Sequence, residues 1–181
     1  MRQIIISIFI LFTYNVLSQA NINSSSYNKI INGKIESGDK FILKVNYCLK
    51  KPLNNPTCPF CNCYSIDSLV NILKTVPKYN IEIITNTDFR GKELNNLNLS
   101  KSISKSIRNY LINSSIDSTR ITAIGLGSTQ LYIFKNDTVI KNINVKKGTV
   151  VNKEFTRKII NKELKEQLIS LNRRIIIRFI F

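Results

Sequence analysis

The sequence contains no histidine, which removes the most common general base, the usual pH-sensing side chain and the imidazole metal ligand together. It also offers no nucleophile paired with a base and no glycine loop that would cradle a phosphate. Gly125 and Gly127 end an expected strand but lack the third glycine and the helix of a dinucleotide-binding motif. Asp88, Glu82 and Glu93 are the carboxylates that a glycoside-cleaving pair would need, and the sequence does not place any two of them together. We therefore expect a protein that is not an enzyme and that has no metal or cofactor.

Acidic residues are scarce, with 11 Asp and Glu against 27 Lys and Arg, and the formal net charge is +16. A body with this charge is attracted to anionic partners such as cell-wall polymers or lipid head groups. The alternative is compositional, because Lys, Asn and Ile are abundant throughout, as in chains encoded by AT-rich genomes. Nucleic acid is not expected as a partner, because the chain is expected to be exported.

Long apolar runs are also scarce, and the one at the N-terminus is short. Met1-Arg2, the run Ile4 to Phe12 and Ser18-Gln19-Ala20 have the order of a secretory signal. We expect a signal peptide over 1–20 and a polar lead-in over 21–40, the alternative being an uncleaved membrane anchor. No cysteine follows the expected cleavage site, so lipidation there is not expected, and the mature protein is expected to be soluble.

Only four cysteines occur, and three of them fall in a loop expected at 50–64. An even number of cysteines in an exported protein favours two disulfides, with Cys48 tied to the loop that holds Cys58, Cys61 and Cys63. A zinc site and a thiol redox centre remain as alternatives, because four thiols can bind zinc and Cys58-Pro59-Phe60-Cys61 has the spacing of a redox pair.

Apolar spacing predicts an α+β domain over 41–181. Alternation predicts a strand from Phe41 to Leu49, and helical spacing from Ser65 to Pro77 predicts a helix. A strand at 80–85, a second helix and a strand at 120–125 complete a β-α-β-α-β order. Right-handed crossovers would place both helices on one face of the sheet. The apolar stripe of the second helix is expected to comprise Leu99, Ile103, Ile107, Tyr110 and Leu111.

The last third of the chain predicts an inserted hairpin at about 129–151, a third helix and a closing strand at 174–181. The whole is an α+β sandwich. A terminal Phe181 on an alternating strand is also typical of an outer-membrane barrel, but a barrel needs about eight such segments and the chain has too few. The apolar positions are Ile160, Leu164, Leu168 and Leu171 for the helix, and Ile175, Ile177, Phe179 and Phe181 for the strand.

Several short segments, in order and at consistent spacing, resemble one known family. The first is the strand and loop Ile81 to Gly91, in which Asn86-Thr87-Asp88-x-x-Gly91 stands where that family has H-T-D-x-x-G. Asn96-x-x-Leu99-Ser100 and Ile107-x-x-Tyr110-Leu111 match its N-x-x-L-S and V-x-x-Y-L, and 116–127 and 172–175 match its R-I-x-x-x-G-x-G strand and its N-R-R-V. The family is the peptidoglycan-associated domain of the OmpA/MotB proteins, and the resemblance extends over about 41–181.

The resemblance implies non-covalent binding of the peptidoglycan stem peptide, typically at its diaminopimelate unit. In the family the loop aspartate, here Asp88, takes an ammonium group, and a helix arginine takes a carboxylate. Ile103 stands at that arginine position, and restoring the arginine is expected to tighten binding roughly tenfold. Lys101 and Lys105 point away from it on a helix, so Arg90 beside the aspartate is the better candidate cation. The expected ligand-binding set is Asn86, Thr87, Asp88, Arg90, Gly91, Asn96 and Ile103.

Two functions therefore remain. One is a cell-envelope protein, in the periplasm or at the outer membrane of a Gram-negative bacterium, that binds peptidoglycan. The other is an OmpA-like structural module that has lost this ligand and uses the Cys-rich loop and the hairpin on an envelope protein. Asp88 and Asn96 favour the first, and Ile103 favours the second.

Overall fold

A computed structural model describes residues 35–43 and 64–180. The expected signal peptide, the lead-in up to residue 34, the first strand beyond residue 43 and Phe181 lie outside the described residues. So do all four cysteines and residues 50–63 of the Cys-rich loop, and the disulfide prediction stays a prediction.

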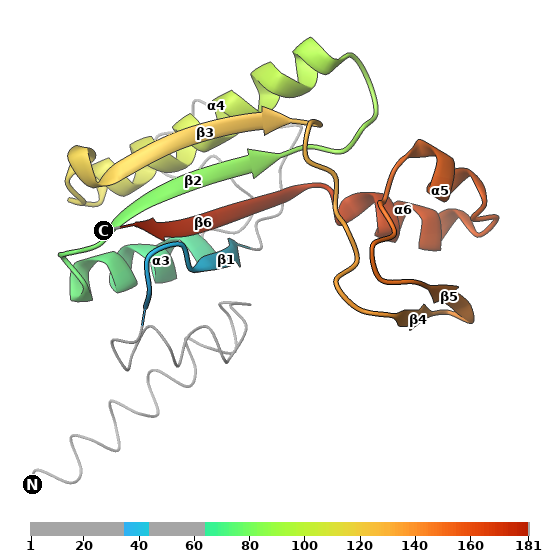
Figure 1. The fold of residues 1–181 in the computed structure, drawn as a ribbon. Helices are drawn as coiled ribbons and strands as arrows, with labels where there is room; N and C mark the ends of the chain where they lie inside the picture. The colour runs from blue at the N-terminus through green and yellow to red at the C-terminus, as the bar shows by residue number, and fades with distance from the viewer. Residues whose placement is uncertain (1–34, 44–63, 181) are drawn as a thin grey trace, which may run out of the picture. The chain divides into compact units, whose positions relative to one another are not determined.

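The fold is α+β, with four strands in the order β1-β6-β2-β3 and a separate two-stranded sheet, β4-β5 (Figure 1). Within the described part, the predicted helices and strands are present in the predicted order, and one short helix, α5, was not predicted. The elements are β1 (Lys40–Leu43), α3 (Tyr64–Thr75), β2 (Asn80–Asn86), α4 (Glu93–Asn113), β3 (Ile121–Gly127), β4 (Thr138–Ile140), β5 (Ile143–Val145), α5 (Lys153–Arg157), α6 (Lys162–Ser170) and β6 (Arg174–Ile180).

The chain divides into two compact units. Of the described residues, the first unit comprises those up to 83 together with 106–122 and 175–180, and the second comprises 84–105 and 123–174. In the first unit, β1 and β6 are antiparallel, with Phe41 opposite Ile177. Alternate residues of β6 are buried, so one face of this strand belongs to the core, as the period of two predicted.

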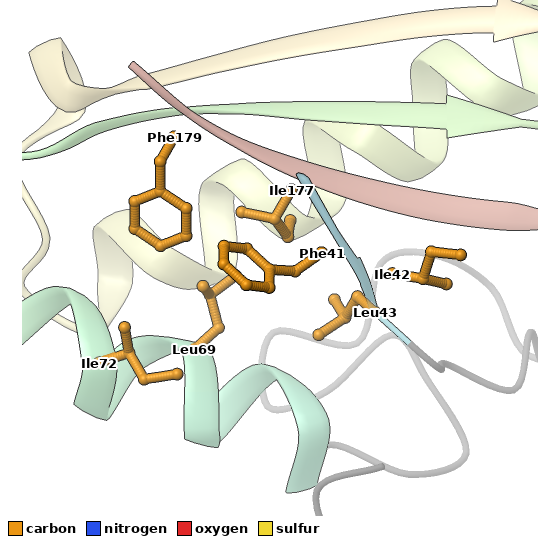
Figure 2. A pocket seen from close by; sticks show the side chains of 7 residues that line it. All are labelled: Phe41, Ile42, Leu43, Leu69, Ile72, Ile177 and Phe179. Carbon is orange, nitrogen blue, oxygen red and sulfur yellow. The ribbon is translucent and has the colours of Figure 1, made fainter. Parts of the chain in front are cut away.

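Three aromatic side chains pack together in the core of the first unit. The ring of Phe179 meets the rings of Phe41 and Tyr79 edge to face, at centroid distances of 5.4 and 5.9 Å. At one edge of this core, an apolar pocket lies between β1, β6 and α3 (Figure 2). Its lining consists of Phe41, Ile42, Leu43, Leu69, Ile72, Ile177 and Phe179.

The C-terminal end of α3 is closed by a side chain that lies far along the sequence. The guanidinium of Arg120 donates hydrogen bonds to the carbonyl oxygens of Leu73, Val76 and Tyr79, at 3.2, 2.9 and 2.9 Å. The last carbonyls of a helix have no partner within it. Arg120 therefore supplies the donors that α3 and the turn after it lack.

In the second unit, α4 and β3 approach so closely that only glycine fits on the strand. A Cβ added at Gly125 would lie 2.2 Å from the backbone nitrogen of Lys101, and one at Gly127 would lie 2.9 Å from that of Leu97. The amide of Gly127 donates a 2.8 Å hydrogen bond to the hydroxyl of Ser100. The G-x-G pair is thus a packing feature, in agreement with the absence of a dinucleotide motif.

Residues 131–171, which we call the C-terminal lobe, have a small core of their own. The predicted hairpin is β4-β5, and its turn is at Lys141 and Asn142, which both have positive φ, as a type I′ turn requires. The buried core of the lobe consists of Phe134, Val145, Val151, Ile159, Leu164 and Leu168.

One fully buried side chain closes the C-terminal lobe. The Asn172 amide oxygen accepts a 2.6 Å hydrogen bond from the backbone N–H of Tyr132, and its nitrogen donates 2.9 Å to the carbonyl of Val151. Asn172, which directly follows the lobe in the sequence, thereby links Tyr132 near the start of the lobe to Val151 in its middle.

Two predicted core positions are wrong. Ile160 is 97% exposed, because α6 begins only after the cap Asn161, whose side chain accepts from the Leu164 amide. Leu99 on α4 is 37% exposed. The buried positions on that part of α4 belong instead to Asn96 and Ser100.

Candidate functional site

The loop between β2 and α4 has a fixed backbone. The Thr87 amide donates 2.8 Å to the carbonyl of Gly127, and the Thr87 hydroxyl donates 3.2 Å to the carbonyl of Asp88. Gly91 has φ +88°, a region that residues with a Cβ rarely adopt. Thr87 and Gly91 therefore shape the loop through its backbone.

Asn96, in the first turns of α4, holds the same loop from the other side. Its buried side-chain nitrogen donates to the carbonyl oxygens of Asp88 and Arg90, at 3.1 and 2.9 Å. Asn96 is thus a positioning residue, because its donor groups are used on the backbone of the loop.

The carboxylate of Asp88 is bound by two arginines. Its Oδ1 accepts from the backbone amide of Arg90 at 2.9 Å and from Arg90 Nε at 3.1 Å. Its Oδ2 accepts from Arg90 Nη2 at 2.7 Å and from Arg173 Nη1 at 2.8 Å. Asp88 is only 10% exposed, so its charge is neutralised by these two guanidinium groups more than by water.

Glu166 of α6 binds the same two arginines from the outside. Its Oε2 accepts from Arg90 Nη1 at 2.8 Å, and its Oε1 accepts from Arg90 Nη2 at 3.1 Å and Arg173 Nη1 at 3.0 Å. The result is a four-residue ion-pair cluster of Asp88, Arg90, Glu166 and Arg173, with two negative and two positive groups. The side chains of Arg90, Arg173 and Glu166 are 49%, 31% and 51% exposed, so this cluster is open on the Glu166 side.

The cluster keeps both carboxyl groups ionised. Burial raises the pKa of Asp88, but the hydrogen bonds from Arg90 and Arg173 outweigh it, and this pKa lies below its ordinary value. The pKa of Glu166 is likewise raised by burial and lowered by more through the same two arginines. Hydrogen bonding to Asp88 raises the pKa of Arg90, so its guanidinium stays charged at any ordinary pH.

Ile103 and Asn86, like Thr87, Gly91 and Asn96, contribute no group to the ion-pair cluster. Ile103 is 4% exposed on the buried side of α4, between Ser100 and Ser104, which are also buried. Asn86 is buried at the end of β2, and neither atom of its amide has a hydrogen-bond partner among the described residues.

Other charged residues of α4 and β2 are engaged elsewhere or exposed. Lys101 and Lys105 are exposed on α4, and the guanidinium of Arg108 donates to the carbonyls of Ser118 and Ile121. The carboxylate of Glu82 accepts from Arg178. Across residues 35–43 and 64–180, no three Cys, Asp or Glu side chains gather in a way that suits a metal ion.

Arg173 and Glu166 are the site residues that the sequence interpretation missed. Arg173 belongs to Asn172-Arg173-Arg174, which was recognised as a family segment but given no role. Glu166 had no signal, because it is one of several charged residues on the exposed side of a short amphipathic helix. Only the tertiary structure brings these residues, 76 and 85 positions from their loop partners, to the cluster.

The solved structures that match this chain come from several bacteria. The peptidoglycan-associated lipoprotein of Burkholderia pseudomallei is 20% identical, covers 71% of this chain and 99% of its own, and has a TM-score of 0.46. A putative MotB-like protein of Desulfovibrio vulgaris is 17% identical, with coverages of 92% and 91% and a TM-score of 0.49. An outer membrane protein of Borrelia burgdorferi is 20% identical, with coverages of 81% and 93% and a TM-score of 0.47. No curated protein matches the sequence.

The sequence model of the OmpA family matches residues 64–144. This stretch contains α3, β2, the loop with Asp88, α4 and β3, and it ends within the hairpin, before Glu166 and Arg173. None of the helices in the described ranges combines the length and apolarity that a membrane span requires.

Because the family model matches them, residues 64–144, with the loop that carries Asp88, belong to a domain of the OmpA family.

Proposed function

We propose that this chain is a non-enzymatic protein of the bacterial cell envelope that binds peptidoglycan non-covalently, through the stem peptide. The observation that carries this proposal is the presence of two guanidinium groups, from Arg90 and Arg173, on the carboxylate of the OmpA-type loop. Export, and a place in the periplasm or at the outer membrane, are part of the proposal.

The amino-acid end of a stem peptide presents an ammonium and a carboxylate, and charge-assisted hydrogen bonds to fixed partners give such groups both strength and orientation. The expected helix arginine is replaced by buried Ile103, so the cation has to come from elsewhere. Arg90 and Arg173 offer that cation in the second unit, on the loop and just before β6. The basic surface adds non-specific attraction to an anionic wall.

Co-sedimentation with purified peptidoglycan tests the proposal. Arg173→Gln is expected to weaken binding by about tenfold or more, because a charge-assisted contact is lost. Arg157→Gln is the matched control, since it removes the same charge from an exposed position on α5 and is expected to leave binding unchanged. Equal losses in the two variants, or complete loss of wild-type binding at about 0.5 M salt, would mean that bulk electrostatics alone draws the protein to the wall.

One observation favours a second function, that of an OmpA-like module that has lost peptidoglycan. The loop carboxylate of Asp88 is already paired with two arginines of its own chain. In that case wild-type protein and Arg173→Gln stay in the supernatant alike. The partner would then be an envelope protein, bound through the Cys-rich loop or the β4-β5 hairpin.

A further inference from the structure

Asp88 has no free acceptor position for a ligand. A carboxylate offers about four lone-pair sites, and the two oxygens of Asp88 accept four hydrogen bonds, three from Arg90 and one from Arg173. An ammonium group would have to displace a guanidinium from a carboxylate that is only 10% exposed. The carboxylate of Asp88 therefore positions Arg90 and Arg173 and does not itself bind a ligand.

The contact of the two arginines with Glu166 is more exposed than their contact with Asp88. Glu166 meets Arg90 and Arg173 at 2.8 to 3.1 Å, in the two-oxygen geometry in which a guanidinium binds a ligand carboxylate. Its side chain is 51% exposed and lies on a surface helix, so a change of rotamer releases it into water once a ligand carboxylate takes over its hydrogen bonds to the two arginines. The Nε and Nη2 atoms of Arg173 donate to no acceptor within the described residues, which leaves further donors beside Glu166.

We propose that Arg90 and Arg173 form a carboxylate-binding site and that Glu166 occupies it as an internal competitor, which a ligand carboxylate must displace. This inference rests on the proposed function and deepens it: the group recognised is a carboxylate of the wall peptide, and Glu166 sets the affinity. The exchange replaces one carboxylate by another, so the net charge of the ion-pair cluster is the same before and after.

The stretch that matches the OmpA family contains only half of the ion-pair cluster. Asp88 and Arg90 lie within the stretch that matches the OmpA family, whereas Glu166 and Arg173 lie beyond it. Glu163, one turn earlier on α6, forms its ion pair with Lys141 at 3.8 Å and accepts a hydrogen bond from Gln167 at 3.4 Å, and among the described residues it has neither with the cluster. Glu163 therefore provides a control on the same helix, with the same change of charge.

The experiment is a titration of the full chain with two small probes, followed by NMR of the arginine side-chain N–H groups. N-acetyl-D-alanine carries a carboxylate and no ammonium, and D-alanine amide carries an ammonium and no carboxylate. We expect N-acetyl-D-alanine alone to shift the signals of Arg90 and Arg173. Glu166→Gln is expected to bind it about tenfold more tightly than wild type, whereas Glu163→Gln binds as wild type does. Adding Arg173→Gln to Glu166→Gln should remove the gain.

Two results would overturn the inference: equal affinities for Glu166→Gln and Glu163→Gln, or binding of D-alanine amide in place of N-acetyl-D-alanine. Co-sedimentation of the same variants with peptidoglycan separates this from a failure of the proposed function. If the small carboxylate binds and Glu166→Gln strengthens it while no variant sediments with the wall, the carboxylate site stands and the peptidoglycan proposal fails. If the wall binds wild type and Glu166→Gln equally, the peptidoglycan proposal stands and the competitor role fails.

Discussion

The backbone of Gly125 on β3 lies against the backbone of Lys101 on α4, at a distance that leaves no room for a Cβ between them. A methyl group there would meet main-chain atoms, which cannot move aside as a flexible side chain can. The strand and the helix are therefore fixed to each other at this point.

We expect Gly125→Ala to lower the free energy of unfolding by about 3 kcal/mol or more, since overpacking against backbone forces the helix away from the strand. Gly148→Ala is the comparison, because Gly148 has open space around it and φ +85°, so its cost of about 1 kcal/mol reflects backbone conformation alone. Urea denaturation measures both. Equal losses would show that α4 can shift at little cost.

Arg120→Gln should destabilise the first unit by about 2 to 3 kcal/mol, because the carbonyls of Leu73, Val76 and Tyr79 lose their donors. Arg157→Gln, on the exposed α5, is expected to change stability by less than about 0.5 kcal/mol. If the two variants unfold at the same denaturant concentration, water replaces the arginine at the end of α3 without loss.

Asp88→Asn should make the fold less stable at neutral pH and less sensitive to acid. The pKa of Asp88 is lower in the folded than in the unfolded chain, so its contribution is complete above the unfolded value near 4 and is lost as the pH falls through the folded value. We expect a loss of about 2 kcal/mol at pH ~7, moderated by the partial exposure of the arginines. The measurement is the unfolding free energy between pH ~7 and ~2.5. Asp137→Asn, at an exposed site, should keep the wild-type acid sensitivity.

Ile103→Arg tests whether the family arginine can be restored by one substitution. Ile103 is buried, so a guanidinium there loses its hydration, and we expect a loss of about 3 kcal/mol of stability together with little of the tighter binding that the resemblance implies. Ile103→Met keeps the site apolar and should cost less than about 1.5 kcal/mol. A stable Ile103→Arg protein that binds peptidoglycan about tenfold more tightly would contradict this expectation.

The cysteines can be tested directly by mass. Two disulfides among Cys48, Cys58, Cys61 and Cys63 would lower the intact mass of the exported protein by about 4 Da relative to the reduced form. Four free thiols after oxidative export, or a tightly bound zinc ion, would contradict the prediction.

Apolar periodicity predicted most of the fold because β1 and β6 alternate cleanly and α4 buries one stripe. It failed where a polar residue is buried for a specific hydrogen bond. Asn96 and Ser100 take the positions that Leu99 was expected to share, because they bond to the loop carbonyls and to the Gly127 amide. The short α5 was also missed, since five residues give too little pattern to recognise.

The site was only half predictable. Asp88 and Arg90 are neighbours in a recognisable loop, so their association follows from local sequence. Arg173 and Glu166 come to them through the packing of the C-terminal lobe, and nothing in a single sequence reports that contact. Which residue replaces the missing helix arginine is therefore a question of tertiary structure.

The bridge that Asn172 makes between Tyr132 and Val151 has a consequence for how this protein tolerates change in length. Because one side chain ties the lobe together near its base, residues added at the tip of the hairpin lengthen a loop whose ends are already joined. Doubling such a loop costs only about 0.6 kcal/mol of closure entropy. Removal of the tie would instead leave the Tyr132 N–H and the Val151 carbonyl without the partners that Asn172 supplies. Relatives can therefore be expected to differ freely in length around Lys141-Asn142 and to keep an amide at the position of Asn172.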